Sequence, residues 1–198
     1  TYQTLLSSRR YGNGAAGQGF QPSASQRSLY DGRIQTANGE VRYQATRGNL
    51  LSGGYEFETE NYAFDFVNRG NPASPSAVNT TQRSNALFVQ DQAQWLDGRL
   101  LVSGAFRAQH FALERPILSP AASAPFQGVA FASPPAAYTG DGSVAYFVRA
   151  TGTKLRAHAG RGYRAPSLYE RFGTGFDSFF GYSAYGDPRL EPEHSLAF

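Results

Sequence analysis

The stretch KLRAHAGRGYRAPSLYERFGTGFDSFFGYSAYGDPRLEPE, from Lys154 to Glu193, decides the fold. Its first part alternates with period two, so that Lys154, Arg156 and His158 share one face and Leu155, Ala157 and Ala159 share the other. A strand with a charged face opposite a small apolar face has to border two different solvents. The alternation breaks at residues 162–166 into an aromatic and glycine-rich segment, and residues 189–193 are predicted to begin another strand.

Two motifs lie in this stretch, GYRAPSLYE at residues 162–170 and GDPRLEPE at residues 186–193. In this order they resemble the paired signature of the barrel of TonB-dependent outer-membrane receptors. There, an aromatic-Arg-Ala-Pro segment ends one strand and an Asn-Pro-x-Leu-x-Pro-Glu segment opens the next. The residues that carry the resemblance are Gly162, Tyr163, Arg164, Ala165, Pro166, Glu170, Asp187, Pro188, Leu190, Pro192 and Glu193. Asp187 stands where Asn is usual, and either residue before proline favours a turn.

The composition excludes a helical membrane span. The 198 residues are 40% hydrophobic with a mean hydropathy of -0.44, and no window approaches the roughly 18 to 20 consecutive apolar residues of a membrane helix. A membrane barrel shows only alternating segments of about ten residues, diluted by a polar lumen and loops. The low mean hydropathy therefore does not decide between a soluble protein and a barrel.

The chain has no cysteine, which rules out disulfides and thiolate metal sites within it, and it also has no methionine. Because it begins with Thr1 and ends inside an apparent strand, we expect a piece of a longer reading frame, with any signal peptide upstream. The formal charge of +3 is spread without a Lys/Arg cluster, so nucleic acid is not an expected partner.

Short turns and long loops alternate along the chain. Short turns are predicted at residues 47–49, 97–98 and 151–152, and long loops at residues 12–27, 68–80, 114–139 and 166–188. In an up-and-down meander this places every long loop at one end. We count seven or eight strands, several of twelve or more residues, which exceeds the usual globular length of about five or six.

The alternation of polar and apolar residues also predicts which side chains lie on each face of the barrel wall that these strands would form. Leu100, Val102, Phe106 and Ala157 are expected to face lipid. The water-facing lumen wall is expected to carry Glu56, Glu58, Arg107, Lys154, Arg156 and His158. Asp91 is an exception, because it falls on the apolar face of its strand.

No catalytic, phosphate or metal site stands out. The carboxylate row at residues 56, 58 and 60 has no accompanying base or nucleophile, and the three histidines lack the spacing of metal ligands. No glycine pair joins a buried strand to a helix, as a phosphate loop would. We therefore expect a protein that is not an enzyme and needs no cofactor.

The fourth long loop is rich in rings. An aromatic girdle and loop packing explain these rings most simply. The candidates for ligand contact are Arg171, Phe176, Phe179, Phe180, Tyr182 and Tyr185. Arg164 and Arg171 either hold an anionic ligand or pair with Glu170 and Asp177.

Residues and resemblance together predict an all-β, antiparallel up-and-down transmembrane β-barrel segment with short periplasmic turns and long extracellular loops. Residues 1–198 would form about a third of a barrel of about 22 strands, with the plug domain outside this chain. The resemblance implies an integral protein of a Gram-negative type outer membrane. Such a protein binds a scarce nutrient, either a small molecule of the siderophore, cobalamin or haem classes or an oligosaccharide, and imports it with energy from an inner-membrane TonB complex.

Two alternatives remain open. One is a passive porin or adhesin-type outer-membrane barrel, which a plug domain and a TonB box upstream would argue against. The other is a soluble, secreted, β-rich carbohydrate-binding or hydrolytic domain, in which a second protein layer would cover the row of Leu100, Val102 and Phe106.

Overall fold

The computed structural model describes residues 1–11, 26–68, 76–123, 126–173, 176–177, 182–183 and 186–198. Most of these residues lie in strands. Neither of the short helices among them is long and apolar enough to cross a membrane. The elements in chain order are β1 (Tyr2–Tyr11), β2 (Gln26–Thr46), β3 (Asn49–Asn68), β4 (Ser76–Trp95), β5 (Leu100–Leu113), β6 (Ile117–Leu118), α1 (Pro120–Ser123), β7 (Ala137–Val148), β8 (Thr153–Arg164), α2 (Leu168–Phe172), β9 (Phe176–Asp177), β10 (Tyr182–Ser183) and β11 (Glu193–Ala197).

One antiparallel sheet contains nearly all of the strands. Its order is β1-β2-β3-β4-β5-β7-β8-β11, with β6 added to β4, and β9 and β10 form a separate small hairpin. Every neighbour in this order is the next long strand along the chain, which is the up-and-down meander that the sequence predicts. Within the described residues β1 and β11 do not pair with each other, so the sheet is open.

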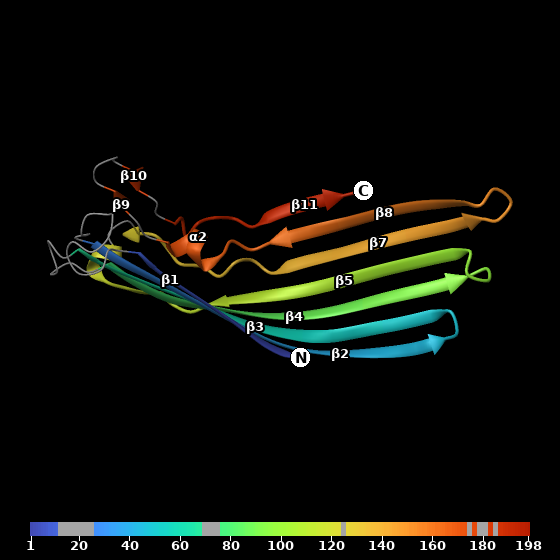
Figure 1. Ribbon diagram of the computed structural model, residues 1–198, viewed down its shortest axis with the longest axis horizontal. Coiled ribbons are helices and arrows are strands. Elements are labelled where there is room, and N and C mark those ends of the chain that lie inside the picture. The colour runs from blue at the N-terminus through green and yellow to red at the C-terminus, as the bar shows by residue number, and fades with distance from the viewer. Residues whose placement is uncertain (12–25, 69–75, 124–125, 174–175, 178–181, 184–185) are drawn as a thin grey trace, which may run out of the picture.

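Turns and loops segregate to opposite ends of the sheet (Figure 1). The tight connections β2–β3, β4–β5 and β7–β8 lie at one end, and α2 lies at the other, where β2 begins and β3 ends. The β4–β5 turn has positive φ at Leu96, Asp97 and Gly98. Leu96 is unusual there, because side chains with a Cβ are strained in this region, whereas Gly98 accepts it freely.

The register places the predicted faces on opposite sides of the sheet. Val102 pairs with Val144, and Val144 with Ala157, so these side chains share what we call the outer face. Arg156 pairs with Ala145 on the opposite, inner face. Outer-face side chains are open, with Val41 at 73%, Leu155 at 58% and Phe106 at 49% exposure. No second layer of described residues covers them, which argues against a compact two-sheet core.

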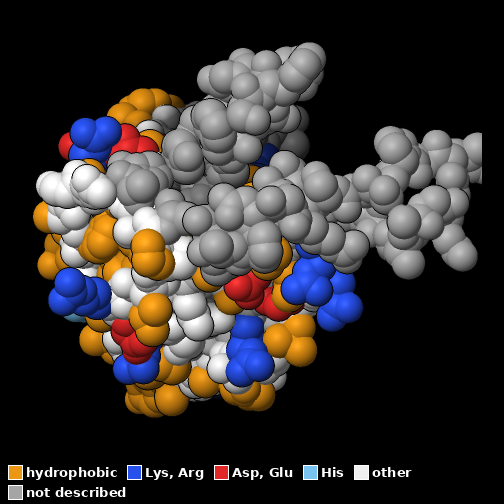
Figure 2. Space-filling model, turned by 90° about the vertical axis from the view of Figure 1, so that its left-hand side faces the viewer, with side chains coloured by type: hydrophobic (Ala, Val, Ile, Leu, Met, Phe, Trp, Pro, Cys, Tyr) orange, Lys and Arg blue, Asp and Glu red, His pale blue; other side chains and the backbone are white. Residues whose placement is uncertain are grey.

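Aromatic side chains border the apolar part of the outer face. Trp95 pairs with Leu100, which pairs with Tyr146, in a row beside the short turns. Nearer the long loops, the rings of Phe106 and Tyr138 stack with centroids 6.5 Å apart. Two such rows around an apolar band are typical of a barrel at the two membrane interfaces. Figure 2, a view of the long-loop end, shows hydrophobic side chains along the rim.

The strands continue beyond the apolar band. On β3 the outer face changes from Tyr55 and Phe57 to Thr59 and Asn61, and Asn61 binds Asn79 Oδ1 at 3.0 Å. About 9 to 11 residues of a tilted strand suffice to cross a bilayer, whereas β3 has 20. The second half of such a strand therefore projects toward the long loops.

The loop boundaries predicted from the sequence differ from the observed ones more than the predicted strands do. β4 already begins at Ser76 and β7 at Ala137, inside the predicted loops 68–80 and 114–139. The predicted loop 166–188 contains α2 and the β9–β10 hairpin, and β11 begins only at Glu193. Asp91, the exception on the apolar face, accepts a hydrogen bond of 2.7 Å from Asn49 Nδ2.

Candidate ligand site at the long-loop end

Helix α2 begins with a capping box built from the first motif. The Ser167 hydroxyl accepts a hydrogen bond from Glu170 N at 3.2 Å, and Glu170 Oε2 accepts one from Ser167 N at 2.8 Å. Each side chain thus satisfies a backbone donor that the first helical turn would leave unpaired. The hydrogen bond from Ser167 N, a second one from the Ser167 hydroxyl to Glu170 Oε2 at 2.9 Å, and the Arg164 guanidinium together hold the pKa of the Glu170 carboxyl below its usual range.

The two sequence motifs contact each other. Arg164 at the end of β8 pairs with Glu170 at 2.5 Å and with Glu193 at 3.2 Å. Asp187 N donates to Glu170 O at 3.1 Å, and the Asp187 carboxylate accepts from Arg189 N at 2.9 Å, which turns the chain back toward β11. The motifs therefore build one junction that returns the chain from β8 to the sheet.

Arg171 fixes this junction from inside. Its side chain is buried, and its guanidinium donates to Pro188 O at 3.0 Å and to Ala132 O at 2.5 Å. Its carbon Cζ lies 5.2 Å from the ring centre of Phe172. Burial lowers the pKa of Arg171. In this arrangement the guanidinium joins three segments of the long-loop end.

Helix α2 packs on the inner face of the sheet. Leu168 and Phe172 are fully buried in a cluster that they form with inner side chains of β3 and β4 and with one residue of α1. The members of the cluster are Tyr62, Phe64, Val78, Ala122, Leu168 and Phe172. Leu168 N also lies 3.5 Å from the Glu60 carboxylate, a hydrogen bond to β3. The apolar core thus sits inside the long-loop end, where it positions α2 across the wall.

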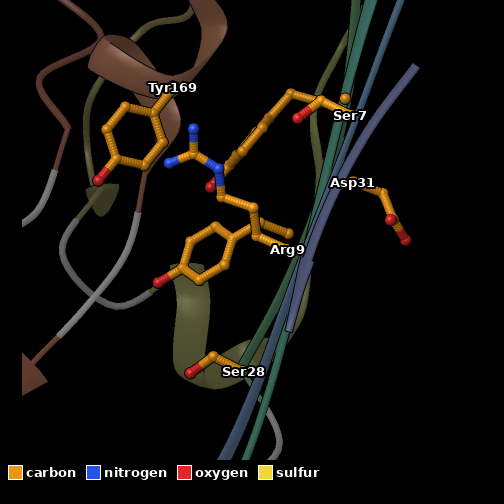
Figure 3. A pocket seen from close by; sticks show the side chains of 8 residues that line it. Ser7, Arg9, Ser28, Asp31 and Tyr169 are labelled. Atoms are coloured by element: carbon orange, nitrogen blue, oxygen red, sulfur yellow. The ribbon is translucent and has the colours of Figure 1, made fainter. Parts of the chain in front are cut away.

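A cavity of about 460 Å³ opens between α2 and the first strands. Figure 3 shows Arg9 reaching from β1 toward the ring of Tyr169 on α2. Asp31 projects from the other side of the strands. The lining residues are Ser7, Arg9, Ser28, Tyr30, Asp31, Gly32, Tyr62 and Tyr169. Its place beyond the apolar band and on the inner face makes it a candidate site for capture of a ligand.

Three tyrosine rings give the cavity its shape. The centroid of Tyr169 lies 6.5 Å from that of Tyr30 and 6.0 Å from that of Tyr62, both in edge-to-face geometry. Tyr30 in turn packs on Phe64 at 4.7 Å. Edge-to-face rings of this spacing attract one another and hold their planes.

The inner wall below the cavity carries the charged side chains that alternation predicted. Arg107 pairs with Glu56 at 2.5 Å, and both are partly buried. His158 Nε2 lies 3.9 Å from the Asp141 carboxylate. A second hollow of about 600 Å³ lies along this part of the wall. No three His, Cys, Asp or Glu side chains among the described residues gather as metal ligands would.

Most of the other residues of the two motifs take part in strand pairing or packing. Tyr163 stacks on Phe111 with centroids 5.9 Å apart and donates to Pro135 O at 3.0 Å. Gly162 pairs with Ser195, and a Cβ at this glycine would meet the Ser195 hydroxyl. Pro166 and Pro188 are buried, Ala165 and Pro192 are half-buried, and Leu190 is exposed.

The candidate ligand contacts of the fourth loop stay predictions. Phe176 and Tyr182 lie on the paired strands β9 and β10. Phe179, Phe180 and Tyr185 lie outside the described residues. Arg171 points into the junction, and Arg164 pairs with Glu170, one of the two pairings considered from the sequence.

Sequence reasoning missed the residues of the cavity. Arg9, Tyr30 and Tyr62 lie on three different strands, and only the register brings them to Tyr169. One signal was available, because Ser167-x-x-Glu170 directly after Pro166 is a capping-box pattern that predicts a helix start.

Comparison with known proteins agrees with this architecture. A model of the family described as TonB dependent receptor-like, beta-barrel matches residues 1–198. Among solved structures, a similar chain is the "Copper transporter OprC", with a TM-score of 0.67 and 12% identity. The likeness covers 98% of this chain and 32% of that chain, so this chain spans about a third of its length. No curated protein matches the sequence.

Proposed function

Because the chain belongs to the TonB-dependent receptor-like β-barrel family, we propose that it is part of the wall of an outer-membrane receptor. The receptor captures a scarce nutrient at the long-loop end and imports it with TonB-coupled energy. Its chemistry is binding and release, with no bond broken. The observation that carries this proposal is the pair of faces: an uncovered apolar band outside, and a charged wall with a ring-lined cavity inside.

The open sheet supports a larger closed barrel. β1 and β11 each present one edge without a partner among the described residues, and an unpaired backbone edge is not tolerated in lipid. Further strands would pair with these two edges and close the wall. A plug would then lie against the inner face that carries Glu56, Arg107 and Arg156.

The nutrient belongs to one of the classes carried by such receptors: a siderophore, cobalamin, haem or a glycan. Copper is not carried over from the similar structure, because 12% identity supports only the fold. This chain also has no cysteine or methionine, the soft ligands that favour Cu(I).

Energised uptake separates this function from that of a passive porin or adhesin-type barrel. The test is uptake of candidate nutrients by cells that carry the complete protein, with and without a functional TonB complex. Accumulation that disappears without TonB supports the receptor. Equal uptake in both strains, linear in external concentration, would instead identify a passive channel.

A further inference from the structure

The cavity between β1, β2 and α2 presents one positive charge. Arg9 and Asp31 are the charged residues among those that line it. Asp31 projects from the outer side of the sheet, whereas Arg9 points inward (Figure 3). Arg9 forms no ion pair with any described residue. A guanidinium in this position favours an anion with two oxygens, which it can bind in a bidentate manner.

The rings around Arg9 favour a flat ligand. Tyr30, Tyr62 and Tyr169 present faces and edges that an aromatic ring can meet in stacked or edge-to-face geometry. Tyrosine rings alone would equally suit a cation. Arg9 in the same cavity repels a cation, so the combination selects against positively charged ligands.

Tyr62 adds ring surface to the cavity. It lines the cavity, and the residue is 7% exposed. Its hydroxyl is shielded from solvent, so this side chain offers a ligand its ring and no hydrogen bond.

We propose that this cavity binds a planar aromatic anion, with a carboxylate on Arg9 and its ring packed against the rings of Tyr30, Tyr62 and Tyr169. This rests on the receptor function proposed above and narrows its substrate class. The volume of about 460 Å³ lies within the usual range of about 300 to 1,000 Å³ for small-molecule sites.

The test uses the complete receptor in detergent and three probes, with affinities measured by titration calorimetry. Naphthalene-2-carboxylate carries both the ring and the charge. Naphthalene-2-carboxamide keeps the ring without the charge, and cyclohexanecarboxylate keeps the charge without an aromatic ring. We expect the first probe to bind at least ten times more tightly than either of the others.

The variants Arg9→Gln and Arg10→Gln form a matched pair, because Arg10 is the next residue on β1 and points to the outer face. Arg9→Gln should weaken naphthalene-2-carboxylate at least tenfold, and Arg10→Gln should leave it unchanged.

Three outcomes would overturn the proposal: equal affinity for carboxylate and carboxamide, equal effects of the two arginine variants, or tight binding of a neutral disaccharide in the same cavity. If no probe binds while TonB-dependent uptake persists, the ligand class is wrong and the receptor function stands. If naphthalene-2-carboxylate binds as expected while uptake proves independent of TonB, the ligand class stands and energised transport does not.

Discussion

Arg164 and Glu193 lie directly opposite each other on β8 and β11, and their side chains pair at 3.2 Å. Between them in sequence lie 28 residues that leave the sheet, form α2 and return. The pair therefore marks the two points where this excursion leaves and rejoins the wall. Because Arg164 also pairs with Glu170, one guanidinium connects the end of β8, the helix and the start of β11.

The first prediction concerns pH. Hydrogen bonds from Ser167 lower the pKa of Glu170 in the folded protein, so its ionised form stabilises docked α2. This stabilisation is fully present above the carboxyl pKa of the unfolded chain and is lost as the pH falls through the lower, folded pKa. The protection factors of the amides of residues 168–173, which are exchange rates corrected for the intrinsic pH dependence of exchange, should therefore fall on acidification.

In Glu170→Gln the same amides should exchange faster at neutral pH and lose most of this acid dependence. Glu193→Gln provides the control, since its carboxylate is more exposed than that of Glu170 and, within the described part of the chain, forms an ion pair with Arg164 alone. An acid response that is unchanged in Glu170→Gln would exclude the capping box as its source.

The second prediction concerns Arg171. Lysine keeps the charge but lacks the planar guanidinium that donates to Pro188 O and Ala132 O at the same time. We expect Arg171→Lys to destabilise the long-loop end by about 1.5 to 3 kcal/mol, the usual range for hydrogen bonds to a charged group. Urea titration with a probe attached to this end measures the loss. Full stability in the lysine variant would show that the two carbonyl contacts contribute little.

The third prediction concerns the two faces. Ala157→Arg or Val102→Arg places a charge between the two aromatic rows of the outer face and should cost about 2 to 4 kcal/mol near the midplane. Arg156→Glu, on the inner face one residue away, should be tolerated. Heat-modifiable electrophoretic mobility of the complete protein reports barrel assembly. Equal assembly of both kinds of variant would contradict the assignment of faces.

The fourth prediction concerns Gly54 on the inner face of β3. A Cβ at this position would meet the carbonyl of Gly39 and lie 2.6 Å from Phe88 Cζ. We expect Gly54→Ala to cost about 1 to 3 kcal/mol through overpacking. Gly39→Ala is the matched control, because a Cβ on Gly39 would have no described atom within 4 Å. Denaturant titration of both variants gives the comparison.

The alternation of polar and apolar residues is enough to predict the two faces of the sheet, because the face on which a residue such as Val102 lies follows from the residues next to it in the sequence. The tight turns can also be predicted from neighbouring residues, since Asp97-Gly98 and Thr151-Gly152 are turn-forming pairs. Gly98 and Gly152 both adopt positive φ. Periodicity predicts a loop where α2 forms, because the five residues of this helix are too few to show a helical repeat. The cavity required contacts between Arg9 and Tyr169, which are far apart in sequence and meet only through the register of several strands.

The length of β2 and β3 has a consequence for experiments on intact cells. Beyond Phe57, β3 continues for 11 residues, or roughly 35 Å along the strand. Hydrogen-bonded pairing with β2 and β4 persists over most of that distance. Such an extension would hold the cavity of Arg9 and Tyr169 clear of the lipid headgroups on a stiff support, so that labels attached to its outer face would stand away from the bilayer.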